Sequence, residues 1–282
     1  HRGCARTRAG SGVMRRIAHL SDLHFGAAIP EIVDALVATI ARLEPHVVAI
    51  SGDLTQRARR SQFRDARAFL DALRGPTVVV PGNHDVPLYN VLARFGDPLG
   101  SFRRHITAEA YPCYRDTEIA VVGANTTRSF TIKDGGLRPA DVRQLSNVLD
   151  EAGPGRVRII VCHHPFAAPA GRGRWTAPAP DAEAVNTLVA RGADIFLTGH
   201  LHLTYVGHTA TRYQVSGRSA IVVEAGTATS FRGRGEVNSF NLLRVDDGGV
   251  AVERHDWDAQ TARFTVAAVD EFVRSETGWK SA

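Results

Sequence analysis

The nine residues TVVVPGNHD, at positions 77–85, join a run of β-branched residues to a turn that carries an amide, an imidazole and a carboxylate. β-Branched side chains favour strands, and proline and glycine favour the turn that follows. The segment therefore predicts a buried strand over 77–80 whose carboxyl end presents Asn83, His84 and Asp85.

Two similar segments precede this one in the sequence. An apolar strand predicted over 17–21 leads into Asp22 and His24, and a second, predicted over 47–51, leads into Gly52-Asp53. Each places metal-capable side chains directly after a strand, which is the arrangement already seen at position 83.

Helices are predicted between these strands. Apolar residues recur at spacings of three and four over 32–43 and again over 62–73, which gives each segment one apolar stripe. The order strand–helix–strand–helix–strand is typical of a largely parallel sheet with right-handed crossovers.

The second half of the chain continues the pattern. Further strands are predicted over 119–123, 157–162 and 195–198, and helices over 139–149 and 182–190. The strand over 157–162 ends at His163, and the strand over 195–198 ends at Gly199-His200-Leu201-His202. The proline- and glycine-rich segment 166–180 is expected to be a loop that borders the substrate.

Short alternating runs follow His202. The runs over 205–208, 220–224, 240–245 and 250–256 predict antiparallel strands that complete a second sheet. The last stretch, 269–277, is expected to be helical. Because there is no internal repeat, long linker or change in composition, we expect residues 14–282 to form a single domain, with 1–13 as a disordered or non-native extension.

Five apolar strands thus end in a group that could bind a metal. In open α/β sheets, ligands bind outside the carboxyl ends of the strands, so these five points are expected to meet in one crevice. A single Asp-x-His or buried histidine is weak evidence, because such residues are common in protein cores. The joint occurrence of all five, in order and each at a strand end, carries the prediction.

Charge and ligand type indicate which metals would bind. Asp22 and Asp53 contribute two negative charges, so two divalent ions would retain a net positive charge that attracts a phosphate ester. Mixed imidazole and carboxylate ligands favour manganese or iron, with zinc or cobalt as alternatives, over an all-oxygen magnesium or calcium site.

These motifs together resemble the calcineurin-like metallophosphoesterase superfamily, and they span residues 17–202. The resemblance implies an α/β fold in the form of a four-layer αββα sandwich, with two mixed sheets flanked by helices. It implies that Asp53 bridges two metals, that His84 is a catalytic residue that meets the phosphate and the leaving group, and that Asp85 orients His84. The implied metal ligands are Asp22, His24 and His202 for the first ion and Asn83, His163 and His200 for the second.

The choice between His163 and His164 is the open point in this ligand set. Side chains alternate along a strand, so only one of the two is expected to face the metals. His163 is preferred because family members commonly place this ligand two residues before a proline, here Pro165. His164 and Asn125 are candidate substrate contacts.

The resemblance implies hydrolysis of a phosphodiester by a hydroxide that bridges the two metals. The closest likeness is to bacterial class III cyclic-nucleotide phosphodiesterases, so the expected substrate is a small-molecule or 3′,5′-cyclic nucleotide diester. The alternatives are a UDP-2,3-diacylglucosamine-type pyrophosphatase, a broad-specificity diesterase or monoesterase and, in another class, an inactive binding scaffold. An apolar helical insert that would grip the acyl chains of a lipid substrate is not evident from the sequence.

Composition limits the partners. The formal net charge is +5, but 32 of the 34 basic residues are arginines that are scattered along the 282-residue chain, so nucleic acid is not the expected partner. No apolar run is long enough for a membrane span. Three cysteines without zinc-type spacing fit a reducing cytoplasm, the expected location. The oligomeric state stays open.

Overall fold

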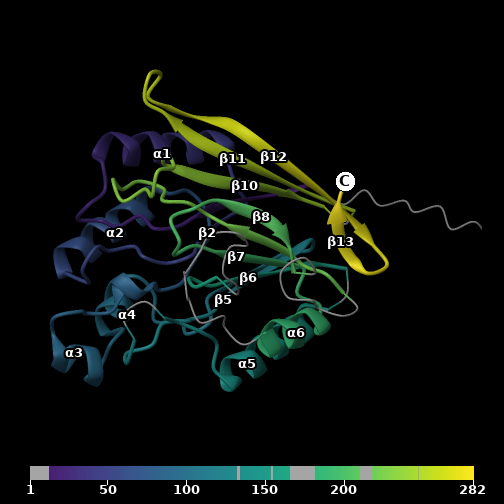
Figure 1. Cartoon of the computed structure of the whole chain (residues 1–282), viewed down its shortest axis with the longest axis horizontal. Coiled ribbons are helices and arrows are strands. Elements are labelled where there is room, and N and C mark those ends of the chain that lie inside the picture. The colour runs from purple at the N-terminus through teal and green to yellow at the C-terminus, as the bar shows by residue number, and fades with distance from the viewer. Residues whose placement is uncertain (1–12, 132–133, 154, 166–181, 210–217, 247) are drawn as a thin grey trace, which may run out of the picture.

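Two β-sheets pack face to face, and helices cover their outer faces (Figure 1). The computed structural model describes residues 13–282, apart from 132–133, 154, 166–181, 210–217 and 247. Residues 1–12 of the predicted extension at 1–13, and the predicted loop at 166–180, therefore lie outside the described residues. The four-layer αββα sandwich is confirmed.

The first sheet has seven strands in the order β13-β12-β11-β10-β1-β2-β3. Strands β1, β2 and β3 are parallel, whereas β10 pairs antiparallel with β1 and starts an antiparallel extension. The strands are β1 (Arg15–Leu20), β2 (Val47–Ile50), β3 (Thr77–Val79), β10 (Ser239–Val245), β11 (Gly249–Asp258), β12 (Arg263–Ser275) and β13 (Gly278–Ser281).

The second sheet has six strands in the order β4-β5-β6-β7-β9-β8. Its centre, from β5 to β9, is parallel, and antiparallel strands close both edges. The strands are β4 (Cys113–Arg115), β5 (Ile119–Gly123), β6 (Val157–Val161), β7 (Ile195–Thr198), β8 (Tyr205–His208) and β9 (Ile221–Glu224).

The helices lie on opposite sides of the sandwich. Helices α1 and α2 pack on the first sheet, and α5 and α6 pack on the second (Figure 1). The helices are α1 (Pro30–Leu43), α2 (Arg60–Ala72), the 3₁₀ turn η1 (Asn83–Asp85), α3 (Val91–Gly96), α4 (Gly100–His105), α5 (Pro139–Ala152) and α6 (Ala182–Ala190). Within the described ranges, no helix has both the length and the apolar character needed to cross a bilayer.

Strand alternation divides the core into three layers. In β2, Val47 and Ala49 face the second sheet, whereas Val48 and Ile50 face the helices. Both faces of the central strands are therefore buried, as expected for parallel strands covered on two sides. Burial on this scale holds the strand ends rigidly, which positions the site described below.

Two expectations about the C-terminal part were wrong. The runs at 240–245 and 250–256 do not complete the second sheet, because β10 pairs with the free edge of β1. The stretch 269–277 is not helical but belongs mainly to β12, which pairs with β11 along most of its length. Pairing with an existing edge strand overrides the weak local helical pattern there.

Candidate metal centre

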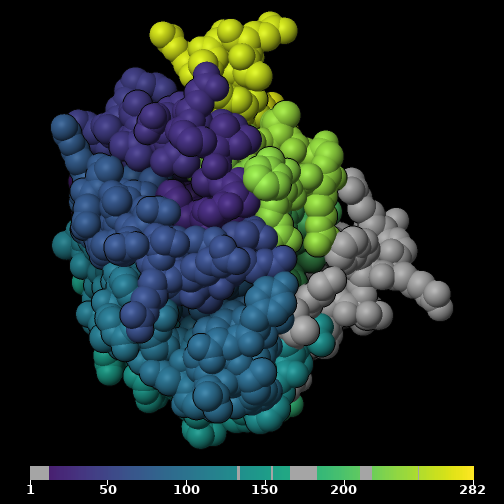
Figure 2. Space-filling view, turned by 90° about the vertical axis from the view of Figure 1, so that its left-hand side faces the viewer, coloured from purple at the N-terminus to yellow at the C-terminus, as the bar shows by residue number. Residues whose placement is uncertain are grey.

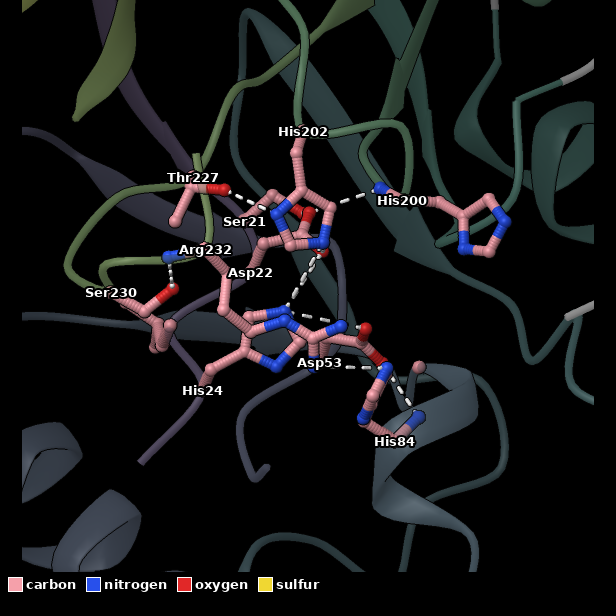
Figure 3. Close-up of polar contacts among 12 residues, drawn as sticks. Ser21, Asp22, His24, Asp53, His84, His200, His202, Thr227, Ser230 and Arg232 are labelled. Carbon is pink, nitrogen blue, oxygen red and sulfur yellow. Dashed lines mark hydrogen bonds and ion pairs between the residues drawn. The ribbon is translucent and has the colours of Figure 1, made fainter. Parts of the chain in front are cut away.

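Polar side chains from both sheets meet at one edge of the sandwich. Parallel pairing places the carboxyl ends of β1, β2 and β3 side by side, and likewise those of β6 and β7. The segments that follow these five strands carry the predicted ligands, and Figure 3 shows Asp22, His24, Asp53 and His202 pointing toward one another. The meeting of distant segments at the strand ends agrees with the rule for α/β sheets.

The backbone at this edge is strained where the predicted ligands lie. Eight residues other than glycine have a positive φ in the described part of the chain. Five of the eight are predicted ligands: Asp22, His24, Asp53, His200 and His202. Left-handed conformations cost a non-glycine residue of the order of 1–3 kcal/mol, so strain gathered at these positions indicates a functional site.

The first cluster consists of Asp22, His24, Asp53 and His202, all buried. Their ligand atoms lie within 4.8 Å of one another. His202 Nε2 is 3.2 Å from Asp22 Oδ1 and 3.3 Å from His24 Nε2. The cluster therefore converges on a volume the size of one ion.

The second cluster consists of Asn83, His163 and His200. Asn83 Oδ1 is 3.1 Å from His163 Nε2 and 3.0 Å from His200 Nδ1, and these two ring nitrogens are 3.2 Å apart. His163 Nδ1–H donates to the Ser51 carbonyl at 2.8 Å, which leaves the Nε2 lone pair facing the cluster. This cluster could hold a second ion.

Asp53 belongs to the first cluster and also faces the second. Its Oδ2 is 3.7 Å from His24 Nε2 in the first cluster, and its Oδ1 is 3.4 Å from His163 Nε2 in the second. The backbone N–H of His84 also donates to Oδ1, at 2.8 Å. A carboxylate with one oxygen toward each cluster can join two cations.

Close packing of turns explains the glycines next to these ligands. Gly52 has φ +93°, and a Cβ built there would lie 2.7 Å from His163 Nδ1 and 2.9 Å from Gly82 Cα. A side chain at Gly82 would in turn collide with Asp53. Only glycine lets the turns after β2 and β3 approach closely enough for the clusters to share Asp53.

The charges of the two clusters are set mainly by burial. Burial, together with Asp22 and Asp85, raises the pKa of Asp53 well above its usual range. Burial opposes ionisation of Asp22 too, but His202 and His24 hold the pKa of that carboxyl well below its usual range. Two carboxylates this close cannot both ionise cheaply without a cation.

The histidines are neutral at physiological pH. Burial lowers the pKa of His163 to about 4 and that of His200 to about 3, and it lowers the pKa values of His24 and His202. A neutral imidazole is the form that binds metals.

These residues fit a pair of divalent cations. Asp22 Oδ1 is buried and accepts no hydrogen bond, although His202 Nε2 is 3.2 Å away. The Nε2 atoms of His24 and His202 face each other at 3.3 Å, an arrangement that two neutral rings satisfy only in opposite tautomers. A cation between them would satisfy all three atoms at once.

The contacts of His84 and Asp85 differ from the expectation that Asp85 orients His84. His84 Nδ1–H donates to the Gln56 carbonyl at 2.9 Å. Asp85 is fully buried and instead accepts hydrogen bonds from the backbone N–H groups of Gly82, Leu54 and Thr55. Asp85 thus links the turns after β2 and β3 through hydrogen bonds. The Gln56 carbonyl, not Asp85, orients the His84 ring.

Of the two candidate substrate contacts, His164 lies beside the second cluster and Asn125 lies farther out. A ring nitrogen of His164 comes within 4.8 Å of those of His163 and His200, so both adjacent histidines face this region. Alternation does not apply to them because β6 ends at Val161. The Asn125 carboxamide accepts hydrogen bonds from Thr127 and lines a neighbouring cavity of about 920 Å³.

Arg232 is the site residue that the sequence reasoning missed. Its guanidinium donates to Gln56 Oε1 at 3.0 Å and approaches His84 Nε2 at 3.3 Å. Figure 3 shows Arg232 reaching over His24 toward His84. It belongs to the segment after β9, whose carboxyl end lies beside that of β7, so position after a strand was the available signal.

The chain matches known proteins at the level of family and fold. A family model described as calcineurin-like phosphoesterase matches residues 15–203. Over 82 residues the chain is 34% identical to glycerophosphodiester phosphodiesterase GpdQ from Enterobacter lignolyticus (strain SCF1). That match covers 24% of this chain and 29% of the relative, less than two thirds of its length.

Solved structures show the same fold at low identity. The purple acid phosphatase PPD1 from yellow lupin (Lupinus luteus) seeds has a TM-score of 0.69 at 14% identity, covering 93% of this chain and 54% of its own. A dimetal phosphatase from Danio rerio has a TM-score of 0.59 at 14% identity, covering 85% and 95%. These likenesses establish the two-sheet sandwich flanked by helices.

Proposed function

Because the chain belongs to the calcineurin-like phosphoesterase family, we propose that it hydrolyses a small phosphodiester at two cations held by the two clusters. Asp22, His24 and His202 would hold one cation, Asn83, His163 and His200 the other, and Asp53 would bridge. The observation that carries this proposal is the position of Asp53, with one carboxylate oxygen toward each cluster.

The choice of a diester is supported by the identity to GpdQ, whose printed name is glycerophosphodiester phosphodiesterase. A cyclic nucleotide or another small diester remains the proposed substrate, with manganese or iron as the proposed metal pair and the cytoplasm as the proposed location. With manganese added, we expect bis(p-nitrophenyl) phosphate to be hydrolysed about tenfold faster than p-nitrophenyl phosphate. A faster monoester reaction would overturn the diester assignment, and two bound metals without any turnover would indicate a binding scaffold.

Within this proposal, bound cations would supply a water of lowered pKa and neutralise charge on the phosphoryl oxygens. The chain's own residues would hold the cations and orient the side chains that bind them. The Ser51 carbonyl and the Thr227 hydroxyl bond the outer nitrogens of His163 and His202, at 2.8 and 2.6 Å, and so fix the direction of each ring. His84 and Arg232 are only partly buried, so a substrate that reaches the clusters from solvent would meet them.

Arg232 is proposed to bind a phosphoryl oxygen. Its guanidinium is already held by Gln56 and lies beside His84, so little rotamer freedom remains to be lost on binding. Arginine is suited to phosphate because its planar fork can donate two parallel hydrogen bonds. It would add one positive charge at the open side of the site.

Arg232→Ala is expected to lower kcat/KM for a diester about 10–100-fold, because one hydrogen bond between charged groups contributes about 1.5–3 kcal/mol. Most of the loss is expected in KM, and Arg232→Lys should recover part of it. Steady-state kinetics measure both effects. Arg263→Ala, an exposed arginine on β12, is the matched control and should change neither constant. Unchanged kinetics for Arg232→Ala would contradict the role.

Removal of metal by a chelator is expected to abolish turnover and to lower the melting temperature by about 5–10 °C. A ligand present at about 100 times its Kd adds about 2.7 kcal/mol to stability, and in a chain of this size each kcal/mol shifts Tm by about 2–4 °C. Bound cations are expected to stabilise the fold because they relieve the repulsion between Asp22 and Asp53. Differential scanning calorimetry with and without manganese measures the shift. An unchanged Tm and full activity after chelation would exclude the metal centre.

A further inference from the structure

Helix α3 has an inverted distribution of side chains. Val91, Leu92 and Phe95 are exposed, whereas Arg94 is buried and donates to the carbonyls of Ser129 and Pro87. A surface helix of a globular protein normally buries its apolar side chains and exposes its charged ones. The outward apolar side of α3 is therefore largely exposed to solvent in the described part of the chain.

The exposed side of α3 continues into its neighbours. Phe130 is 88% exposed and lies 5.6 Å from Phe95 between ring centroids, and Tyr89 precedes the helix. Five of the twelve exposed large apolar residues in the described part of the chain belong to this one area, the α3 patch. The α3 patch consists of Tyr89, Val91, Leu92, Phe95 and Phe130. Large contiguous apolar patches on a protein surface mark an interaction site.

Arginines lie along one side of the α3 patch. A groove of about 770 Å³ separates α3 from the start of α2, and Tyr89 and Leu92 line it together with four arginines: Arg57, Arg59, Arg60 and Arg104. The Arg57 guanidinium lies over the Tyr89 ring, 5.5 Å from its centroid. The one acidic residue in the groove lining is Asp97, which is paired with Arg103. Apolar side chains and an excess of positive charge thus share one surface in the described part of the chain.

We propose that the α3 patch docks on an anionic lipid bilayer. Exposed aromatic and aliphatic side chains bounded by arginines match the apolar and anionic layers of a membrane interface. Each arginine near an anionic surface contributes about 1 kcal/mol, and the apolar side chains add their transfer into the boundary with the acyl chains. Figure 2 shows the face that carries α2, α3 and α4, the face that would meet the membrane.

A second copy of this chain fits the α3 patch less well. The commonest dimer places the same patch of both copies against each other across a two-fold axis. Such an arrangement would bring the arginines around the groove toward their own copies, with Asp97 already engaged. Like charges brought together in this way oppose association, whereas an anionic bilayer attracts them.

Docking through the α3 patch would set the metal centre near the lipid headgroups. Arg57 directly follows Gln56, which contacts Arg232, and Tyr89 lies five residues after His84. The patch, together with the arginines of its groove, and the site therefore share the segments after β2 and β3. The docking proposal does not depend on the proposed function, because binding to vesicles is measured without turnover.

Sedimentation with vesicles tests the proposal. The full chain should bind vesicles of 70% phosphatidylcholine and 30% phosphatidylglycerol at least about tenfold more tightly than pure phosphatidylcholine, and 0.5 M salt should weaken that binding. L92S/F95S/F130S and, separately, R60E/R104E should each lose about tenfold or more. V266S/V269S, which removes exposed valines from β12, should bind like the unaltered chain.

Several outcomes would overturn docking on lipid. The unaltered chain could fail to bind the anionic vesicles, or L92S/F95S/F130S could bind as tightly as V266S/V269S. Light scattering could instead show a dimer that L92S/F95S/F130S separates, which would assign the patch to a second copy. Circular dichroism on each variant confirms that the fold persists, as expected for changes at exposed positions.

Discussion

Asp53→Asn is expected to lower kcat by about 10³–10⁴-fold and to remove at least one of the two proposed cations. The carboxylate faces both clusters, with Oδ2 3.7 Å from His24 Nε2 and Oδ1 3.4 Å from His163 Nε2. An amide keeps the size of the side chain but loses the negative charge and one acceptor oxygen. Two cations would then repel each other without a shared anion between them.

Metal content and turnover must be measured on the same preparation. The metal-to-protein ratio of Asp53→Asn should fall from two to one or below, and kcat should fall with it. Asp194→Asn is the matched control, because Asp194 is also a buried carboxylate but bonds Arg158, Arg218 and Trp279 away from the clusters. That control should lose stability and keep both metals. Two metals and near-normal turnover in Asp53→Asn would refute the bridging role.

The meeting of the strand ends could be predicted because it depends on topology. Parallel strands joined by helices place all their carboxyl ends on one edge, so polar residues directly after β1, β2, β3, β6 and β7 must lie close together. The sequence pattern thus predicted that Asp22, Asp53 and His202 are neighbours. Their roles as metal ligands stay predictions, which the metal analysis of Asp53→Asn and the chelation experiment test.

Arg232 also follows a strand, but it lies well beyond Glu224, where β9 ends, so position after a strand was a weaker signal for it. Its place beside His84 depends on β10 pairing with β1 in the first sheet, since that pairing carries the chain from β9 across the site. The sequence pattern had assigned 240–245 to the second sheet. Because β10 was expected in the second sheet, the course of the connecting segment past His84 could not be predicted.

The role of Asp85 was hidden by a different cause. Motif spacing places Asp85 next to His84 in sequence, but a 3₁₀ turn covers both residues and directs their side chains to different partners.

The exposed apolar side of α3 was missed as well. Local pattern assigns apolar residues to the core, so a short helix that buries its arginine runs against the rule by which helices are predicted.

His84→Ala is expected to reduce turnover of diesters with poor leaving groups by about 10²–10³-fold and to leave both proposed cations in place. General acid–base groups contribute about 10²–10⁴-fold. The backbone N–H of His84, not its ring, donates to Asp53, so the metal clusters keep their geometry when the ring is removed. Because the Gln56 carbonyl accepts from Nδ1–H, the ring presents Nε2 toward the open side of the site.

The state of that ring makes leaving-group dependence the decisive measurement. Burial lowers the pKa of His84 to about 4, so the ring is neutral at pH 7 until a bound phosphoryl anion stabilises its protonated form. A departing alkoxide needs the proton, whereas nitrophenolate leaves without it. His84→Ala should therefore lose about 10²–10³-fold on a glycerophosphodiester and less than about tenfold on bis(p-nitrophenyl) phosphate.

The matched control is His105→Ala, which removes a half-buried histidine stacked on Phe63 away from the clusters. It should leave both substrates unaffected. An equal loss on the two substrates by His84→Ala would argue against proton donation and would leave the ring a role in positioning phosphate with Arg232. In that case His84→Asn, which keeps a hydrogen-bond donor but cannot supply a proton at pH 7, should restore much of the rate. If His84 is the acid, the asparagine should instead be as slow as alanine on the glycerophosphodiester.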